Sequence, residues 1–277
     1  MKTIIVPTDL SPGTDAALSV AVDLARTSGA TILLLHVVVY PLPMPDYAYT
    51  ISMAVSTDRT VAEYREIEQE AEASLKRFAD HAAYNGVTII PTLITNGDGL
   101  VHNVTERPAD LIVMASKGAS GLNEFLFGSN AEEIVRYAHC PVLIVKQPIA
   151  RFKPENIVCA VDVDDRLKAT WHYPFPMGEK GLHQFLYILT SSDDRDPEGV
   201  RDWVNDFARV KGITEFEFIV RPAPTVPEGI TRYADEVNAD LVVLFTQGHK
   251  GLQHLLFGSV AEDVLNHATM PVLIMRV

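Results

Sequence analysis

The chain has 277 residues, of which 47% are hydrophobic and 21% are charged, and its formal net charge is −13. This composition is typical of a folded globular protein and not of a disordered one. The negative charge argues against nucleic acid and against an anionic membrane surface as main partners, because both need clustered lysine and arginine.

The first residues hold no long apolar run before Asp9, which predicts that they are not a secretory signal, and no stretch is apolar enough to predict a membrane span. The two cysteines, Cys140 and Cys159, lie in strand-like sequence. We expect them to be reduced core thiols of a cytoplasmic protein. A disulfide between them is an alternative that the sequence leaves open.

Strand-like and helix-like segments alternate through the first part of the chain. Buried apolar runs predict five strands, at residues 3–6, 32–39, 87–94, 111–115 and 142–146. Helices are predicted after Ser11-Pro12 and at residues 61–85, 97–106 and 130–138. Residues 40–60 hold three prolines and no clear period, and we interpret them as a long loop or lid. This alternation predicts a parallel sheet with helices on both faces.

The same order returns after a linker at residues 147–155. The strands predicted in this second part are 157–161, 185–189, 216–220, 241–245 and 272–275. Residues 171–176 contain two prolines two positions apart, so the first helix of this part is predicted to be damaged.

Residues 110–146 and 240–276 are two copies of one sequence. They align without a gap, so that Asp110 matches Asp240 and Gly128-Ser129 matches Gly258-Ser259. The chain is therefore a duplication, with a first domain at 1–146 and a second at 156–277. Asp9 matches Asp162 at an offset of 153 instead of 130, so the second domain is 23 residues shorter in its N-terminal part. The lid-like loop is the obvious segment to be missing.

In an open parallel sheet, ligands bind at the carboxyl ends of the strands. Three segments of the first domain should meet there, namely 7–9, 36–37 and the run from 115 to Ser129. Gly118 and Gly128 would let the backbone approach a phosphate, and the helix beginning at Ser129 would attract an anion. Lys117 would add a charge-assisted contact.

The sequence Ala115-Ser116-Lys117-Gly118, followed after nine residues by Gly128-Ser129, resembles the nucleotide loop of the universal stress protein family. The opening VPTDLS and the ending CPVLIVK are also typical of that family. The resemblance covers the whole first domain and is strong over 240–276. It implies an α/β fold with two Rossmann-like domains of the adenine nucleotide alpha hydrolase-like (HUP) class, each a five-stranded parallel sheet with helices on both faces.

The resemblance also implies ATP or another adenine nucleotide as cofactor, with or without Mg²⁺. Asp9 would hold the ribose hydroxyls, and Thr8 and Val37 would border the adenine. The expected binding residues of the first domain are Pro7, Thr8, Asp9, Val37, Ala115, Lys117, Gly118, Gly128, Ser129, Asn130 and Ala131. Their low-ranking equivalents in the second domain are Asp162, Gly248, Gly258 and Ser259.

Two residues depart from the family's pattern. Ala115 and Phe245 stand where the family's first glycine is expected, and we expect the second site to be weak or closed. Ser129 and Ser259 also each begin a Ser-x-x-Glu capping box, which a helix needs with or without a ligand. His36 ends a predicted buried strand, and a histidine at such a position is more often packed than catalytic.

The predicted function is that of a regulatory stress-response protein that binds an adenine nucleotide in its first domain and acts on an unidentified protein client. At most slow ATP hydrolysis is expected, because no phosphate loop, nucleophile elbow or magnesium clamp is present. No catalytic residue and no metal site is predicted, since the histidines lack metal spacing. An adenylyl-transferring ligase is the least favoured reading.

The alternative is a structural or interaction module without nucleotide. In it, the two domains pair within the chain through their last strands, 142–146 and 272–275, as two separate subunits would. A homodimer of the whole chain is also possible.

Overall fold

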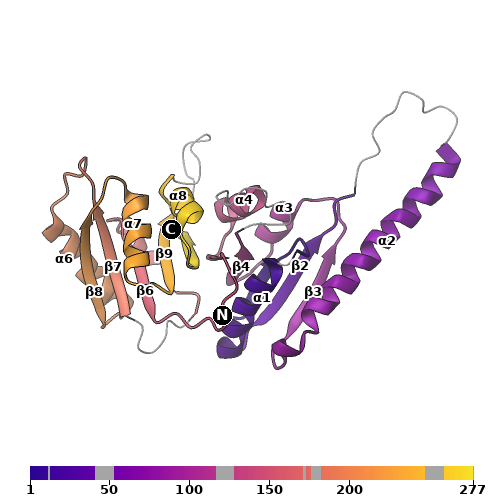
Figure 1. Cartoon of the computed structure of the whole chain (residues 1–277), viewed down its shortest axis with the longest axis horizontal. Helices are drawn as coiled ribbons and strands as arrows, with labels where there is room; N and C mark the ends of the chain where they lie inside the picture. The colour runs from indigo at the N-terminus through magenta and orange to yellow at the C-terminus, as the bar shows by residue number, and fades with distance from the viewer. Residues whose placement is uncertain are drawn as a thin grey trace.

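The computed structural model describes residues 1–11, 13–40, 53–116, 128–170, 173–175, 182–246 and 259–276. Its strands form one ten-stranded sheet in the order β3-β2-β1-β4-β5-β10-β9-β6-β7-β8 (Figure 1). The strands are β1 Thr3–Pro7, β2 Thr31–Val37, β3 Ile89–Ile94, β4 Leu111–Ala115, β5 Val142–Val145, β6 Asn156–Ala160, β7 Leu182–Leu189, β8 Phe216–Pro222, β9 Leu241–Thr246 and β10 Val272–Arg276. The α/β fold with a mostly parallel sheet is therefore confirmed.

Every strand pair is parallel except β5 with β10. The strands of residues 1–146, which we call the first half, occur in the order β3-β2-β1-β4-β5. Those of residues 156–277, the second half, occur in the equivalent order β8-β7-β6-β9-β10. The two last strands meet antiparallel, with Leu143 opposite Leu273, as the sequence predicted for a fused pair.

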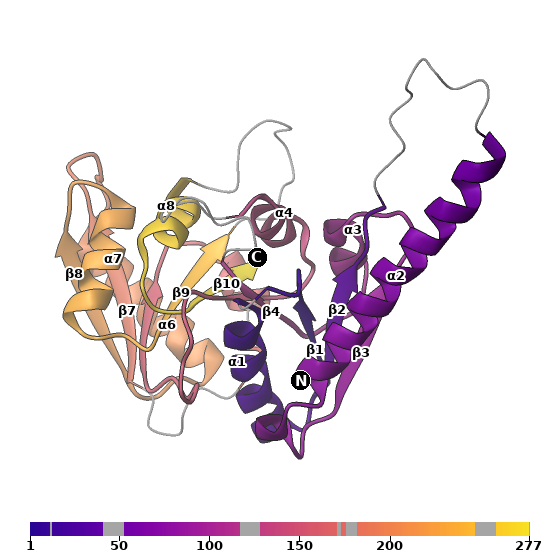
Figure 2. The same ribbon diagram turned by 45° about the vertical axis from the view of Figure 1, so that its right-hand side comes forward.

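The helices form a layer on each face of the sheet (Figures 1 and 2). They are α1 Gly13–Ser28, α2 Met53–Ala79, α3 Leu100–Thr105, α4 Ser129–Tyr137, α5 Arg166–Thr170, α6 Pro197–Lys211, α7 Val226–Glu236 and α8 Ser259–His267, with a 3₁₀ turn η1 at Ala82–Tyr84. One apolar core joins α1, α2, α5 and α6 to the sheet, and another joins α3, α4, α7 and α8 to its opposite face. Each core contains residues of both halves.

The central strands are buried on both faces, which explains their continuous apolar runs. In β1, for example, Ile4, Ile5 and Val6 have no exposed surface. Ile4 belongs to the core under α1, and Ile5 belongs to the core under α3 and α4. Successive side chains of a strand point to opposite faces, so both layers are anchored by the same short segment.

The second helix differs from its prediction at both ends. It begins at Met53 instead of residue 61, because the three prolines all lie at or before residue 45 and nothing after them stops a helix. It ends at Ala79 instead of Asn85, and η1 follows with His81 as its N-cap. Residues 53–60 are therefore helical and not part of a lid, while residues 41–52 lie outside the described part of the chain.

The strand pairing shows where the two halves differ in length. Ile32 pairs with Ile89, 57 residues later, whereas the equivalent His183 pairs with Phe216 only 33 residues later. The second half thus has 24 fewer residues between these strands. Part of the difference is in the helix, since α2 has 27 residues and α6 has 15.

The helix after β6 is short, as its prolines predicted. The helix α5 has five residues, against 16 in α1. Phe175 and Tyr173 follow it outside any helix and still belong to the core or pack against it. Both cysteines are free thiols, so the disulfide alternative is wrong.

Candidate functional site

The loop after β1 lies where the sequence placed the site. The backbone N–H of Thr8 donates to Leu35 O at 2.9 Å, which joins the loop to the end of β2. The buried Thr8 hydroxyl lies 2.5 Å from the Thr14 hydroxyl and accepts from the Leu10 N–H at 2.8 Å. Leu10 adopts a φ of 63°, a left-handed conformation that is uncommon for a branched side chain. This loop is thus held in one unusual shape by its neighbours.

Asp9 lies at the tip of this loop with an exposed side chain. Its Oδ1 accepts from the Ser11 N–H at 3.0 Å. Pro7, just before it, is buried and pairs with Leu35. An ionised carboxylate accepts hydrogen bonds on both of its oxygens, which is the chemistry that hydroxyl groups of a ligand require.

At the candidate site, the end of β2 offers backbone atoms more than side-chain atoms. His36 Nδ1 lies 2.8 Å from Thr8 O, and because a carbonyl oxygen only accepts, Nδ1 carries the proton. The half-buried His36 therefore supports the loop after β1, which agrees with the interpretation that it is a packed histidine. The Val37 side chain is 8% exposed and belongs to the core, so only its backbone can face a ligand.

The third element is the passage from β4 to α4. The Ser116 N–H donates to Val145 O at 3.0 Å, and the Ser116 carbonyl accepts from the Gly128 N–H at 3.2 Å. This brings the start of α4 back over the end of β4. Continuing the β1–β4 register, in which Ile5 pairs with Ile112, places Asp9 level with Ser116. The structure therefore brings the described parts of all three predicted segments to one edge of the sheet.

The first turn of α4 differs from the expected capping box. Its N-cap is Gly128, with no side-chain hydrogen bond, and Ser129 is the first helical residue. Glu132 pairs with Arg136 at 2.7 Å. The capping-box interpretation of Ser129 is therefore wrong, because the helix begins one residue earlier than that box requires.

The residues of this turn have different roles. Ser129 and Asn130 are exposed, whereas the Ala131 side chain is buried in the core. The N–H groups in the first turn of a helix have no partner within the helix, so this end carries partial positive charge. Ala115 is half-buried at the end of β4. Lys117 and Gly118 lie outside the described residues.

The second half has the same framework, and the aspartate at the equivalent place is ion-paired. The Val161 N–H donates to Leu186 O at 3.0 Å, as Thr8 does to Leu35. Asp162, the equivalent of Asp9, pairs with Arg195, whose Nη1 lies 2.9 Å from Asp162 Oδ1. Of the other expected residues here, Ser259 is exposed at the start of α8, and Gly248 and Gly258 lie outside the described residues.

Arg195 is itself fixed by the short segment between β7 and α6. Its N–H donates to Asp193 Oδ1 at 3.0 Å, and its guanidinium lies 5.7 Å from the Tyr187 ring centre. The Tyr187 hydroxyl donates to Asp193. Desolvation, with this hydrogen bond, raises the pKa of Tyr187 to about 12. The bond to Tyr187 and the Arg195 N–H lower the pKa of Asp193. Sequence reasoning missed Arg195, because it lies in the part that does not align with the first half.

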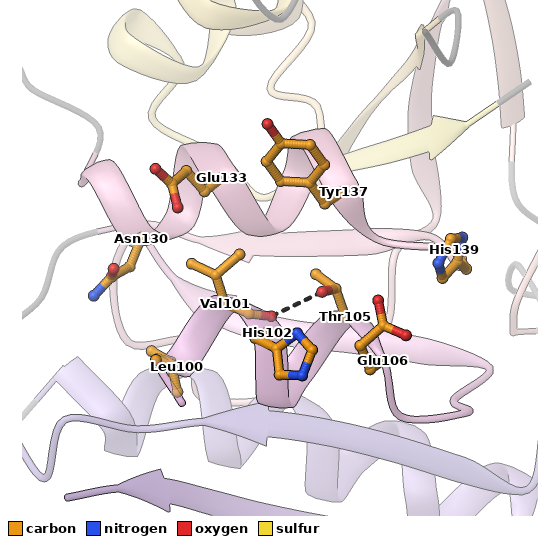
Figure 3. A pocket seen from close by; sticks show the side chains of 10 residues that line it. Leu100, Val101, His102, Thr105, Glu106, Asn130, Glu133, Tyr137 and His139 are labelled. Carbon is orange, nitrogen blue, oxygen red and sulfur yellow. Dashed lines mark hydrogen bonds between the residues drawn. The ribbon is translucent and has the colours of Figure 1, made fainter. Parts of the chain in front are cut away.

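A second concave region lies between α3 and α4 of the first half and was not predicted from the sequence. Figure 3 shows Glu133 and Tyr137 of α4 along one side of this region, and His102 and Glu106, on and just after α3, along the other. The pocket has a volume of about 630 Å³. Its lining is Gly99, Leu100, Val101, His102, Thr105, Glu106, Asn130, Glu133, Tyr137 and His139. Asn130 is the one member shared with the predicted nucleotide residues. Within the described part of the chain, no three carboxylate, histidine or cysteine side chains are grouped to hold a metal ion.

A comparison with protein families matches the description "Universal stress protein family" over residues 1–146 and 192–276. Residues 147–191, which lie between the two matches, include β6, α5 and β7. The unmatched segment is therefore the one in which the first helix is shortened. Every helix in the described residues is too short or too polar to cross a membrane.

Relatives match either one half or the whole chain. Universal stress protein MJ0531 of Methanocaldococcus jannaschii is 31% identical over 150 residues, covering 53% of this chain and 83% of that protein. Universal stress protein Rv2005c of Mycobacterium tuberculosis is 24% identical over 295 residues, covering 99% and 96%. Among solved structures, a universal stress protein from Archaeoglobus fulgidus aligns with a TM-score of 0.63 at 19% identity, covering 99% of this chain and 96% of that one. The likeness to this structure concerns the fold alone.

Proposed function

The chain belongs to the universal stress protein family, and from that premise we propose that its first half binds ATP or a related adenine nucleotide as a regulatory ligand. The proposal is supported by one observation above all. The exposed Asp9, the end of β2 and the first turn of α4 lie at one edge of the sheet.

The phosphates would lie at the start of α4. Its first three N–H groups are unused by the helix, Ser129 and Asn130 are exposed, and the N-cap Gly128 offers no competing side chain. Lys117 and Gly118 remain proposed contacts by family resemblance. Mg²⁺, if required, would enter on the nucleotide's own phosphates, which is how this ion is commonly held.

The nucleoside would lie between the loop after β1 and the end of β2. The exposed Asp9 carboxylate suits a pair of ribose hydroxyls, and backbone groups beside Thr8 and Val37 would border the base. The left-handed Leu10 and the Thr8–Thr14 hydroxyl pair pre-shape this loop. A pre-formed loop lowers the ordering cost that binding must overcome.

The second half would not bind nucleotide. The Arg195 guanidinium is ion-paired with Oδ1 of Asp162, so it would compete with a ribose for this carboxylate. We therefore expect one nucleotide per chain. The segment 41–52 would respond to nucleotide and so alter a surface for a client protein, and Tyr40, which donates to Glu68 of α2, links that segment to the helix.

The test begins with the purified protein. Denaturing it and identifying any released nucleotide by mass spectrometry identifies the ligand, and calorimetric titration with ATP then counts the sites. We expect one site, weakened at least about tenfold by Asp9→Ala, since a lost hydrogen bond to a charged group costs about 1.5–3 kcal/mol.

Gly128→Ala is a second informative variant. Gly128 has a φ of −66°, and an added Cβ would lie 3.7 Å from Ser116 O, so the folded chain accommodates alanine. Alanine is a poorer N-cap than glycine, so we expect a loss of stability below about 1 kcal/mol, and a drop in affinity larger than this would reflect the ligand. The matched control is Asp162→Ala, which should leave the affinity unchanged. Two equivalent sites, or no binding at all, would contradict the proposal, and absence of binding would favour the interaction module.

A further inference from the structure

The strand β8 forms one end of the ten-stranded sheet, and among the described residues only β7 pairs with it (Figure 2). The Ala223 N–H donates to Leu189 O at 3.1 Å, toward β7. Backbone groups of successive residues in a strand point to alternate sides, so those of Phe218 and Val220 point to the open side. An open strand edge of this kind is a template for pairing with another strand.

The opposite end of the sheet is built differently. Ile94 O accepts from the Val38 N–H, toward β2, so the outward residues of β3 include Pro91 and Leu93. Pro91 has no N–H to donate, which makes this edge a poor template. Pro91 is the structural equivalent of Phe218, because Ile89 and Phe216 hold the same place in the two halves. Pro91 therefore interrupts the middle of its edge, whereas the proline of β8, Pro222, is the last residue of its strand.

The side chains of β8 would complement one another if two copies of this strand paired antiparallel. Glu217 and Arg221 are both exposed and flank Ile219 symmetrically on one face of the sheet. The Arg221 guanidinium lies 5.2 Å from the ring centre of Tyr233, which holds it on that face. On the other face, Phe216, Phe218 and Val220 are only half-buried.

We propose that two copies of this chain dimerise by antiparallel pairing of β8 with β8, about a two-fold axis at Ile219. In this register, Phe218 is opposite Val220 of the second copy, and both present their N–H and C=O outward, so they exchange hydrogen bonds. Glu217 is opposite Arg221 of the second copy, twice by symmetry. Opposite charges directly across a strand pair are favourable.

Two other registers are unfavourable because of their charges. An axis at Glu217 would set two glutamates opposite each other, and an axis at Arg221 would set two arginines opposite each other. Like charges directly opposite are destabilising. In the proposed register Pro222 is opposite Phe216 of the second copy, at the two ends of the pairing, so its missing N–H removes only a terminal hydrogen bond. This self-complementarity favours a second copy over an unrelated strand as the occupant.

Sedimentation equilibrium of the full chain tests the proposal. We expect a mass twice the 30.5 kDa of one chain. Glu217→Arg and Arg221→Glu should each raise the dimer dissociation constant about tenfold, because each creates two like-charge contacts. The double variant reverses the pair and should restore the constant to within about threefold of the parent.

Glu215→Arg is the matched control, because it makes the same charge change on the same exposed strand end but faces Ala223 of the second copy. It should leave the dissociation constant nearly unchanged. A monomeric parent chain would overturn the proposal. So would a dimer to which all three single variants are equally sensitive or insensitive, or one that the double variant fails to restore. Circular dichroism confirms that each variant is folded.

Discussion

In each half, one aspartate side chain holds the start of the first strand. Asp110 Oδ2 accepts from the N–H groups of Lys2 and Thr3 at 2.6 and 2.8 Å, just before and at the start of β1. Asp240 Oδ2 accepts from Glu155 and Asn156 in the same way at 3.0 and 2.8 Å, before β6. The two aspartates thus have a structural role that explains why the duplicated sequence begins with them. Their match was visible in the sequence, but their partners, more than 80 residues away, were not.

The hydrogen bonds to Asp110 predict a pH-dependent contribution to stability. The N–H groups of Lys2 and Thr3 hold the pKa of Asp110 below its usual range. A lowered pKa in the folded state means that the stabilisation is complete above the unfolded-state pKa and is lost as the pH falls through the folded-state value. Asp110→Ala should cost about 1 kcal/mol at pH 7, discounted for the exposure of the carboxylate. This cost should shrink as the pH falls from about 5 to 3.

Urea unfolding of parent and variant at each pH measures this cost. The exposed Asp98 supplies the control variant Asp98→Ala. An Asp110→Ala cost that stays constant with pH would show that the carboxylate charge is not what stabilises the strand.

Sequence reasoning at the residue scale placed the end of β1, the end of β2 and the start of α4 at one edge of the sheet, where the described parts of these segments lie. The binding roles of their residues stay predictions. Sequence reasoning could not foresee Arg195, since the segment that carries it has no counterpart in the first half. It also put the start of α4 one residue too late, because Ser129 and Gly128 are both good N-caps.

At the scale of helices, the duplication supplies a pair of equivalent glycines in different surroundings. Gly229 lies in α7, and a Cβ added there would be 2.7 Å from Ile188 Cδ1 and 2.9 Å from Ala223 Cβ. Gly99, its equivalent before α3, has nothing within 4 Å of such an atom. The longer α7 therefore packs closer to the sheet than α3 does.

These surroundings predict that the same substitution costs more stability at Gly229 than at Gly99. Gly229→Ala should reduce the free energy of unfolding by about 1–3 kcal/mol, because the methyl group overpacks the contact with Ile188. Gly99→Ala should cost less than about 1 kcal/mol, through the poorer N-cap alone. Chemical denaturation of the two variants side by side measures the difference. Equal costs would contradict the packing argument.

Apolar periodicity predicted well which segments form helices and strands. It predicted the ends of the helices less well. The strands were placed to within about three residues, because each is a short apolar run between breakers. The long α2 was underestimated at its start, where the sequence from Met53 to Thr60 is neither strongly apolar nor interrupted.

The whole molecule shares its cores between the halves. Each of the two apolar clusters runs through residues of both halves, and β5 and β10 join the half-sheets. Further contacts cross the junction. The Lys146 ammonium donates to Leu265 O, and the Phe152 N–H donates to Asp23 at 2.7 Å. We therefore expect the halves to unfold together.

Both tryptophans, Trp171 and Trp203, lie in the second half. Tryptophan fluorescence thus reports on that half, while far-ultraviolet circular dichroism reports on the whole chain. The two probes should give coincident transitions in urea, as expected for one cooperative unit. A fluorescence transition that precedes the dichroism transition would mean that the halves are independent.

The contrast between the two outer strands decides how far assembly can go. A sheet with two receptive borders would add copy after copy and grow into a fibre, as non-closing contacts do. With Pro91 on one border, a chain can recruit a neighbour only through the other, and the pair that results has proline-bearing strands at both extremities. Pro91 in the first half thus limits the association that β8 of the second half would begin, and we expect assembly to stop at two chains.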